Sequence, residues 1–81
     1  MATFHILTYV RAEGGGFQIS VTSTRADVEH SIPLTDVETG EASSREDAFQ
    51  VRGKLLNRMI TKIRERGDNV VQIREIGDFD R

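Results

Sequence analysis

The residues from Ser43 to Gly67 carry the pattern of one long amphipathic helix, which limits the fold more than any other feature of the chain. At about 100° per residue, its apolar side chains fall within one half of the helical wheel, the width expected for a helix packed on a sheet. We expect Leu56 and Ile60 to lie near the centre of the buried face. The apolar set is Ala48, Phe49, Val51, Leu55, Leu56, Met59, Ile60 and Ile63.

Both ends of this helix are marked in the sequence. Ser43 and Glu46 have the spacing of a capping box, in which each side chain satisfies a free backbone amide of the first turn. Arg64 and Arg66 suit the negative helix end, and Gly67 can adopt the left-handed conformation that terminates helices. The helix is therefore expected to begin near Ser43 and to stop at Gly67.

Two residues depart from the helical pattern. Arg52 lies near the middle of the apolar half, where a charge is costly unless it is paired or reaches water. It either buries its stem and pairs with a sheet carboxylate, or is held for the carboxylate or phosphate of a partner. Gly53 lowers helix stability by about 1 kcal/mol relative to alanine. We therefore expect it to allow close approach of a backbone, either of the chain's own strand or of a partner.

Strand patterns flank the helix on both sides. Apolar residues occupy both alternations of Thr3–Arg11, which predicts a central strand, and the glycines of Ala12–Gly16 predict a tight turn. Phe17–Ser23 alternates strictly, so one face of the sheet is expected to meet water. The remaining predictions are a short edge strand within Ser31–Val37, which contains Pro33, a turn at Glu38–Glu41, a last strand at Asn69–Ile76 and a frayed tail from Gly77.

The predicted fold class is therefore α+β: a small antiparallel sheet of three or four strands with one long helix on one face, in the order ββ(β)αβ. The 81 residues make one domain, 1–81, with room for a single small core. The chain contains no cysteine, which excludes a disulfide framework and a thiolate zinc site, and the cytoplasm is the expected compartment. No apolar run approaches the roughly 18 residues of a membrane span, and the start lacks the profile of a secretory signal, so we expect no membrane partner.

The sequence offers no pattern for catalysis, a cofactor or a metal. His5 and His30 lack metal-ligand spacing, and no serine lies in a nucleophile elbow. The glycines at 14–16 lead from one strand into another, whereas a phosphate loop runs into a helix. We expect a protein that is not an enzyme and that carries no cofactor.

Charge is distributed unevenly along the chain. Residues 43–67 carry seven basic and three acidic side chains, and the other residues carry four and ten. Lys54, Arg58 and Lys62 are spaced four apart and form a basic line on one flank of the helix. This line is either a solvated flank or a surface that meets an acidic protein or a phosphate backbone. Together with Arg52, these residues are the candidate partner-binding set.

The EGGGF turn between two strands, followed by GEASSREDAF at the start of a helix, resembles the HicB-type antitoxin domain. In that family an EGGY/F hairpin is followed by a helix start of the form G-x-[ST]-x-E-E-A, and the matching positions are Glu13 to Phe17 and Gly40 to Ala48. The resemblance implies a toxin protein as partner. In size and in its two-faced charge, the chain is also similar to small phage inhibitors such as anti-CRISPR proteins.

The expected function is that of a non-catalytic binding protein that engages and inhibits a macromolecular partner, with a protein as the expected partner. Two alternatives stay open. One is a nucleic-acid-binding module that uses the basic helix face. The other is a homo-oligomeric scaffold, since the edges of a small sheet can pair with another copy as a homodimer.

Overall fold

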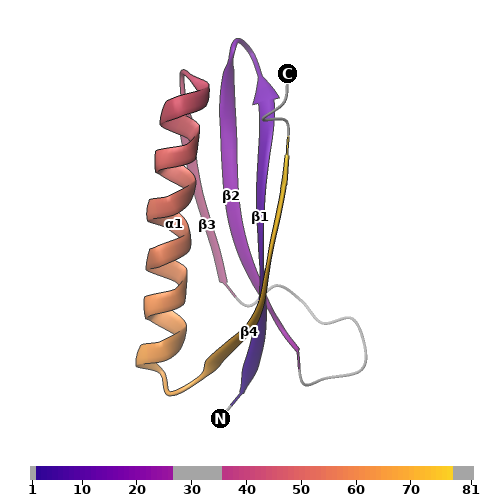
Figure 1. Cartoon of the computed structure of the whole chain (residues 1–81), viewed down its shortest axis with the longest axis vertical. Helices are drawn as coiled ribbons and strands as arrows, with labels where there is room; N and C mark the ends of the chain where they lie inside the picture. Colours follow the sequence, from indigo (N-terminus) through magenta and orange to yellow (C-terminus); the bar gives the residue numbers. More distant parts are fainter. Residues whose placement is uncertain (1, 27–35, 78–81) are drawn as a thin grey trace.

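The computed structural model describes residues 2–26 and 36–77, which form a four-stranded sheet with one helix packed on one of its faces (Figure 1). The order across the sheet is β3-β2-β1-β4. This arrangement confirms the predicted α+β class. The elements are β1 (Thr3–Glu13), β2 (Gly16–Arg25), β3 (Asp36–Ala42), α1 (Arg45–Glu65) and β4 (Asn69–Gly77).

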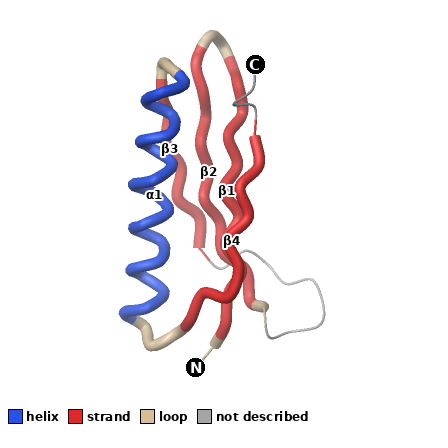
Figure 2. The backbone as a smooth tube through the Cα atoms, in the orientation of Figure 1, coloured by secondary structure: helices blue, strands red, loops and turns tan. Residues whose placement is uncertain are grey.

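The sheet is mixed, whereas the sequence predicted antiparallel pairing. β2 is antiparallel to both β1 and β3, but β4 is parallel to β1. β3 runs in the direction of β1, and α1 then returns the chain to the end of the sheet where β1 begins (Figure 2). A strand that starts there and lies beside β1 has to be parallel to it, and a helical crossover is the usual connection for such a pair.

β1 is an interior strand, as predicted, because it pairs with β2 on one side and β4 on the other. Gly14 and Gly15 have φ values of 60° and 84° and form the two-residue turn between β1 and β2. The predicted turn at Glu38–Glu41 is wrong, because these residues pair with β2 inside β3. The part of the predicted edge strand from residue 31 to 35, which includes Pro33, lies outside the described residues, as do His30 and the tail after Gly77.

The helix ends close to their predicted places. The N-cap is Ser44 and not Ser43, and its hydroxyl accepts a hydrogen bond from the Asp47 backbone N–H at 3.1 Å. The chain offers the same spacing one residue later, so the cap shifts by one position. Gly67 ends the helix as predicted, with φ of 86°. Its N–H donates to Arg64 O at 2.9 Å and the Asp68 N–H donates to Ile63 O at 3.2 Å, the pair of bonds that defines a Schellman motif.

The hydrophobic core lies between α1 and the sheet. Leu56 and Ile60, predicted at its centre, are only half-buried. The helix is rotated toward β3, where Val51 and Leu55 lie against Gly40, and this rotation leaves Leu56 and Ile60 on the flank nearer β4. The fully buried apolar residues are Ala48, Leu55, Met59 and Ile63 from the helix and Phe4, Ile6, Val10, Ile19 and Val21 from the sheet.

Candidate binding surfaces

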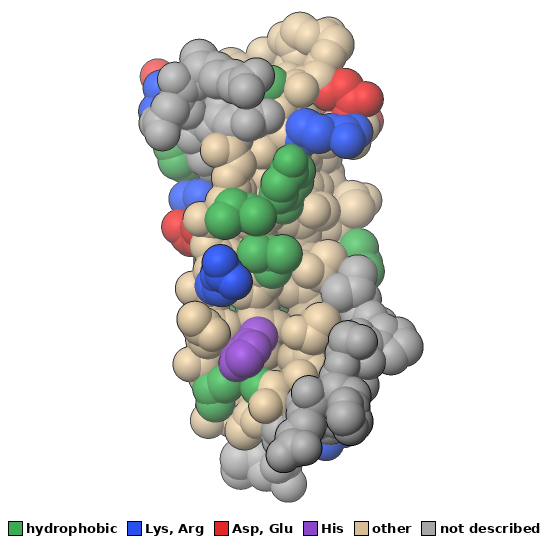
Figure 3. Space-filling view, turned by 90° about the vertical axis from the view of Figure 1, so that its right-hand side faces the viewer, with side chains coloured by type: hydrophobic (Ala, Val, Ile, Leu, Met, Phe, Trp, Pro, Cys, Tyr) green, Lys and Arg blue, Asp and Glu red, His purple; other side chains and the backbone are tan. Residues whose placement is uncertain are grey.

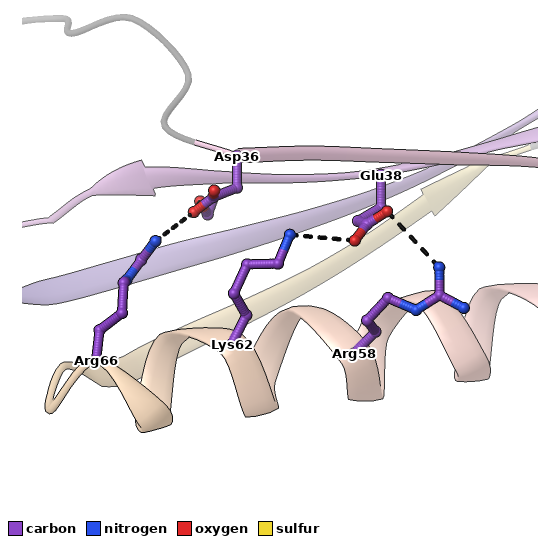
Figure 4. Close-up of polar contacts among 6 residues, drawn as sticks. Asp36, Glu38, Arg58, Lys62 and Arg66 are labelled. Carbon is purple, nitrogen blue, oxygen red and sulfur yellow. Dashed lines mark hydrogen bonds and ion pairs between the residues drawn. The ribbon is translucent and has the colours of Figure 1, made fainter.

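The basic line on α1 faces an acidic strand of the same chain. Glu38 of β3 accepts a hydrogen bond from Lys62 Nζ at 3.2 Å, and its other carboxylate oxygen lies 3.8 Å from an Arg58 guanidinium nitrogen (Figure 4). One turn further along, Arg66 donates to Asp36 at 2.9 Å. We call these five residues the helix–strand clasp. It joins the outer flank of α1 to the edge strand β3.

The clasp changes what the basic line presents to solvent. Arg58 and Lys62 share one carboxylate, so part of their positive charge is neutralised within the chain. Lys54 is exposed and forms no ion pair with any residue in 2–26 or 36–77. A partner-binding role for these three side chains remains a prediction, but the contacts present in the structure serve to hold the helix on the sheet.

Arg52 pairs with a carboxylate of the sheet, which is one of the two environments predicted for it. Its side chain is 19% exposed, and its guanidinium lies 3.6 Å from the Glu75 carboxylate of β4. The same guanidinium lies over the Phe49 ring, 5.2 Å from the ring centre. A charge on the apolar side of α1 is therefore tolerated because it has both a carboxylate and an aromatic face beside it. The prediction that Arg52 pairs with a sheet carboxylate is confirmed.

The predicted close approach of the chain's own strand at Gly53 is wrong. A Cβ atom at Gly53 would meet no heavy atom within 4 Å. The close approach occurs instead at Gly40 in β3, where a Cβ atom would stand 2.8 Å from Val51 Cγ1 and 3.3 Å from Leu55 Cδ1. Helix and strand approach each other at the strand's glycine because the helix leans toward β3. A glycine inside a strand is itself a signal of close approach, and that signal is present at Gly40.

The face of the sheet opposite α1, called the open face from here on, exposes apolar side chains near its middle. Leu7 and Tyr9 of β1 and Ile76 of β4 are 36%, 40% and 42% exposed. Tyr9 pairs with Ile76 in the β1–β4 register, and Leu7 lies two residues away on the same face. Figure 3 shows hydrophobic side chains gathered in the middle of this face, with basic and acidic side chains around them. We call Leu7, Tyr9 and Ile76 the open-face patch.

A groove of about 560 Å³ adjoins the open-face patch. Two cross-strand rows of side chains line it, one from Tyr9 through Ser20 to Thr39 and one from Arg11 through Gln18 to Glu41. Ser20 is short, so the surface sinks beside the larger Tyr9. The groove therefore has one aromatic wall and a polar floor.

The charged side chains around the open-face patch balance one another. Arg11 and Glu13 form an ion pair at 2.7 Å. Arg74 lies beside Leu7 in the register, and Glu41 lies at the far edge on β3. An exposed apolar cluster with a mixed polar rim is the usual composition of a protein–protein contact. A surface with balanced charge has little attraction for a phosphate backbone.

Local sequence does not reveal this patch. The alternation in β1 places Leu7 and Tyr9 on the second face of a central strand, but Ile76 joins them only through the pairing of β1 with β4. The relevant signal was the second set of apolar residues in β1. It indicates burial in a central strand as readily as it indicates a binding face.

Two further observations concern a metal site and a membrane span. Within residues 2–26 and 36–77, no three histidine, aspartate or glutamate side chains are grouped so that they could hold a metal ion. α1, the helix of the described region, is not apolar enough over a sufficient length to cross a membrane.

Comparison with known proteins yields no relative, since no family model, no curated protein and no solved structure matches the chain.

Proposed function

We propose that this chain is a non-catalytic binding protein that engages and blocks a protein partner, as an antitoxin or a phage inhibitor of a host defence would do. The observation that carries the proposal is the open-face patch. Leu7, Tyr9 and Ile76 form one exposed apolar cluster on the sheet face that α1 leaves uncovered. Burying such side chains against a partner is favourable by roughly 25 cal/mol per Å² of apolar area.

Tyr9 is the expected anchor of the contact. Tyrosine is enriched among interface residues that dominate binding energy, because its ring buries a large area while its hydroxyl can still reach a hydrogen-bond partner. Tyr9 lies between Ile76 on one side and the groove beside Ser20 on the other. A partner side chain that enters the groove would therefore contact the Tyr9 ring while its neighbours cover Leu7 and Ile76.

The test uses a partner captured by the native chain from host extract, identified by mass spectrometry and then purified. Tyr9→Glu places a carboxylate in the patch, and we expect it to weaken binding by about 100-fold or more, the range of a dominant interface residue. The matched control is Asn57→Glu, which adds the same charge at an exposed position on α1. Full affinity in a folded Tyr9→Glu variant would contradict the proposal.

The alternative is that the partner binds the basic line on α1. Its test needs variants that leave the helix–strand clasp intact. Changing Lys54, Arg58 and Lys62 together to glutamate would gather carboxylates around Glu38, so lost binding could reflect altered helix packing. Lys54→Glu alone avoids this problem. We expect it to leave affinity for the partner within about twofold, because Lys54 lies on α1, on the other side of the sheet from the open-face patch. A loss as large as that of Tyr9→Glu would transfer the site to the helix flank.

The nucleic-acid alternative is tested with the native chain and a DNA duplex at low salt. Contacts from Lys54, Arg58 and Lys62 to three phosphates would give a log–log salt slope of about −2.7. We expect no measurable binding to DNA. The carboxylate of Glu38 lies between the side chains of Arg58 and Lys62, so it would approach the same phosphates and repel them. A slope of that size would favour the nucleic-acid function.

A further inference from the structure

The outer edge of β4 is the least protected edge of the sheet. Within residues 2–26 and 36–77, β4 pairs with β1 alone, so its other side presents free backbone donors and acceptors. Val71 and Ile73 along this strand are 53% and 42% exposed. An edge strand with exposed apolar side chains is a template for pairing with another strand.

The opposite edge of the sheet has a different character. β3 carries Asp36, Glu38 and Glu41 within its seven residues. Asp36 and Glu38 are paired with basic side chains of α1, and charged side chains along an edge are one of the devices by which edge strands avoid pairing. The charged side chains of β3 therefore disfavour pairing with another strand at that edge. β4 has only one basic and one acidic residue, Arg74 and Glu75, and most of its other residues are apolar.

We propose that β4 pairs antiparallel with β4 of a second copy, about a two-fold axis that passes through Ile73. Such an axis stands perpendicular to the sheet, so residues placed opposite each other must lie on the same face. When the axis passes through Ile73, the Ile73 side chains of the two copies lie opposite each other. Arg74 of one copy then lies opposite Gln72 of the other. Centring on either of the next two residues would set Arg74 or Glu75 opposite itself, and like charges directly opposite are destabilising.

The fold leaves room for this arrangement. α1 packs mainly on β2 and β3 and much less on β4, which it reaches through the Arg52–Glu75 ion pair. The two copies would form a continuous sheet of eight strands, four from each, with both helices on one side. Both open-face patches would lie on the other side. The dimer thus goes beyond the proposed function, which concerns a different surface, and it would offer a partner two patches at once.

The expected dimer is weak. The register of β4 against β1 is irregular between Phe4 and His5, where Val71 has no partner residue in β1. This bulge confines a regular second ladder to the residues after Val71. A contact that buries less than about 1,200 Å² in total is typical of transient association. The dimer should therefore appear only as the protein concentration is raised.

Sedimentation over a range of concentrations up to the high micromolar is the first test. We expect the native chain to pass from monomer to dimer, and Ile73→Lys to weaken this association by about tenfold or more, since it sets two like charges at the two-fold axis. Val37→Lys is the matched control, because Val37 is also exposed but lies on the opposite edge strand. A native chain that stays monomeric at every concentration overturns the proposal.

Cysteine cross-linking tests the register separately, because the chain has no cysteine of its own. Ile73→Cys should form a disulfide-linked dimer under mild oxidation, since directly opposed residues have Cα atoms about 4.5–5.5 Å apart. Val71→Cys should not, because the two residues at position 71 would lie about 13 Å apart along the strands. Efficient cross-linking through position 71, or assemblies that grow beyond a dimer, would contradict this pairing.

The two proposals fail independently. Tyr9→Glu should weaken partner binding and leave the sedimentation of the chain unchanged. Ile73→Lys should weaken the dimer while a single copy still binds the purified partner. A monomeric native chain that binds through Tyr9 would refute the dimer alone, and a dimeric native chain indifferent to Tyr9→Glu would refute the binding site alone.

Discussion

Gly40 of β3 lies directly beneath Val51 of α1, so closely that a Cβ atom on the glycine would stand 2.8 Å from Val51 Cγ1. Valine is branched at Cβ and has little rotamer freedom in a helix, so it cannot easily move aside. The absence of a side chain at Gly40 therefore sets how near α1 can approach the sheet. Leu55 contacts the same position from the next turn of the helix, with its Cδ1 at 3.3 Å.

Gly40→Ala should destabilise the protein by about 1–3 kcal/mol, the usual effect of forcing an extra methyl group into a packed interface. Gly53→Ala is the matched control, because a methyl group there would meet no atom within 4 Å. It should raise stability by about 0.5–1 kcal/mol through helix propensity. Urea unfolding of both variants measures the difference. Equal changes in the two would mean that α1 does not approach β3 as described.

Met59→Ala should lower the free energy of unfolding by about 2–5 kcal/mol, since Met59 is completely buried between α1 and the sheet. Leu56→Ala removes a comparable side chain that is only half-buried, so its effect should be clearly smaller. Chemical denaturation of the two variants compares these effects. A loss for Leu56→Ala that matched the loss for Met59→Ala would show that the rotation of α1 toward β3 is wrong.

Thr8→Val should stabilise the protein. The Thr8 hydroxyl is buried and has no hydrogen-bond partner within the described residues, and valine has nearly the same shape. Removing an unsatisfied buried hydroxyl should recover about 1 kcal/mol. Ser23→Ala serves as the contrast, because the buried Ser23 hydroxyl reaches Asp36 at 3.4 Å. Thermal melting should rise for Thr8→Val and fall for Ser23→Ala, and a fall in both would point to a partner for Thr8.

Glu38→Gln removes the charge shared by Arg58 and Lys62. We expect a loss of at most about 1 kcal/mol, because these two side chains are 62% and 43% exposed and water weakens their attraction to Glu38. The difference from the native chain should shrink in about 1 M salt, where the screening length falls to about 3 Å. Melting curves at low and high salt provide the measurement. An effect that did not change with salt would assign Glu38 a packing role.

The parts of this fold that local sequence predicts are those whose physical cause is local. The amphipathic period and the terminating Gly67 place α1 to within about two residues of its observed bounds, as is usual for element boundaries. Apolar residues identify β1 and β2 as strands, and the strict alternation in β2 also identifies its side that faces the core. In these cases the deciding interactions join residues a few positions apart, so the pattern is visible in a short window.

The remaining features depend on residues that are distant in sequence. The turn signal at Gly40 is overridden because the strand pairs with β2 and the helix needs a glycine beneath Val51. The carboxylate of Glu38 meets two bases of α1 only after the helix has packed across β3.

The open-face patch and the unprotected edge arise in the same way, when α1 returns the chain to the start of β1 and β4 pairs beside it. Periodicity reports which face of a single element is apolar. Which apolar residues stay exposed depends on how the elements pack together, and packing is a property of the whole chain.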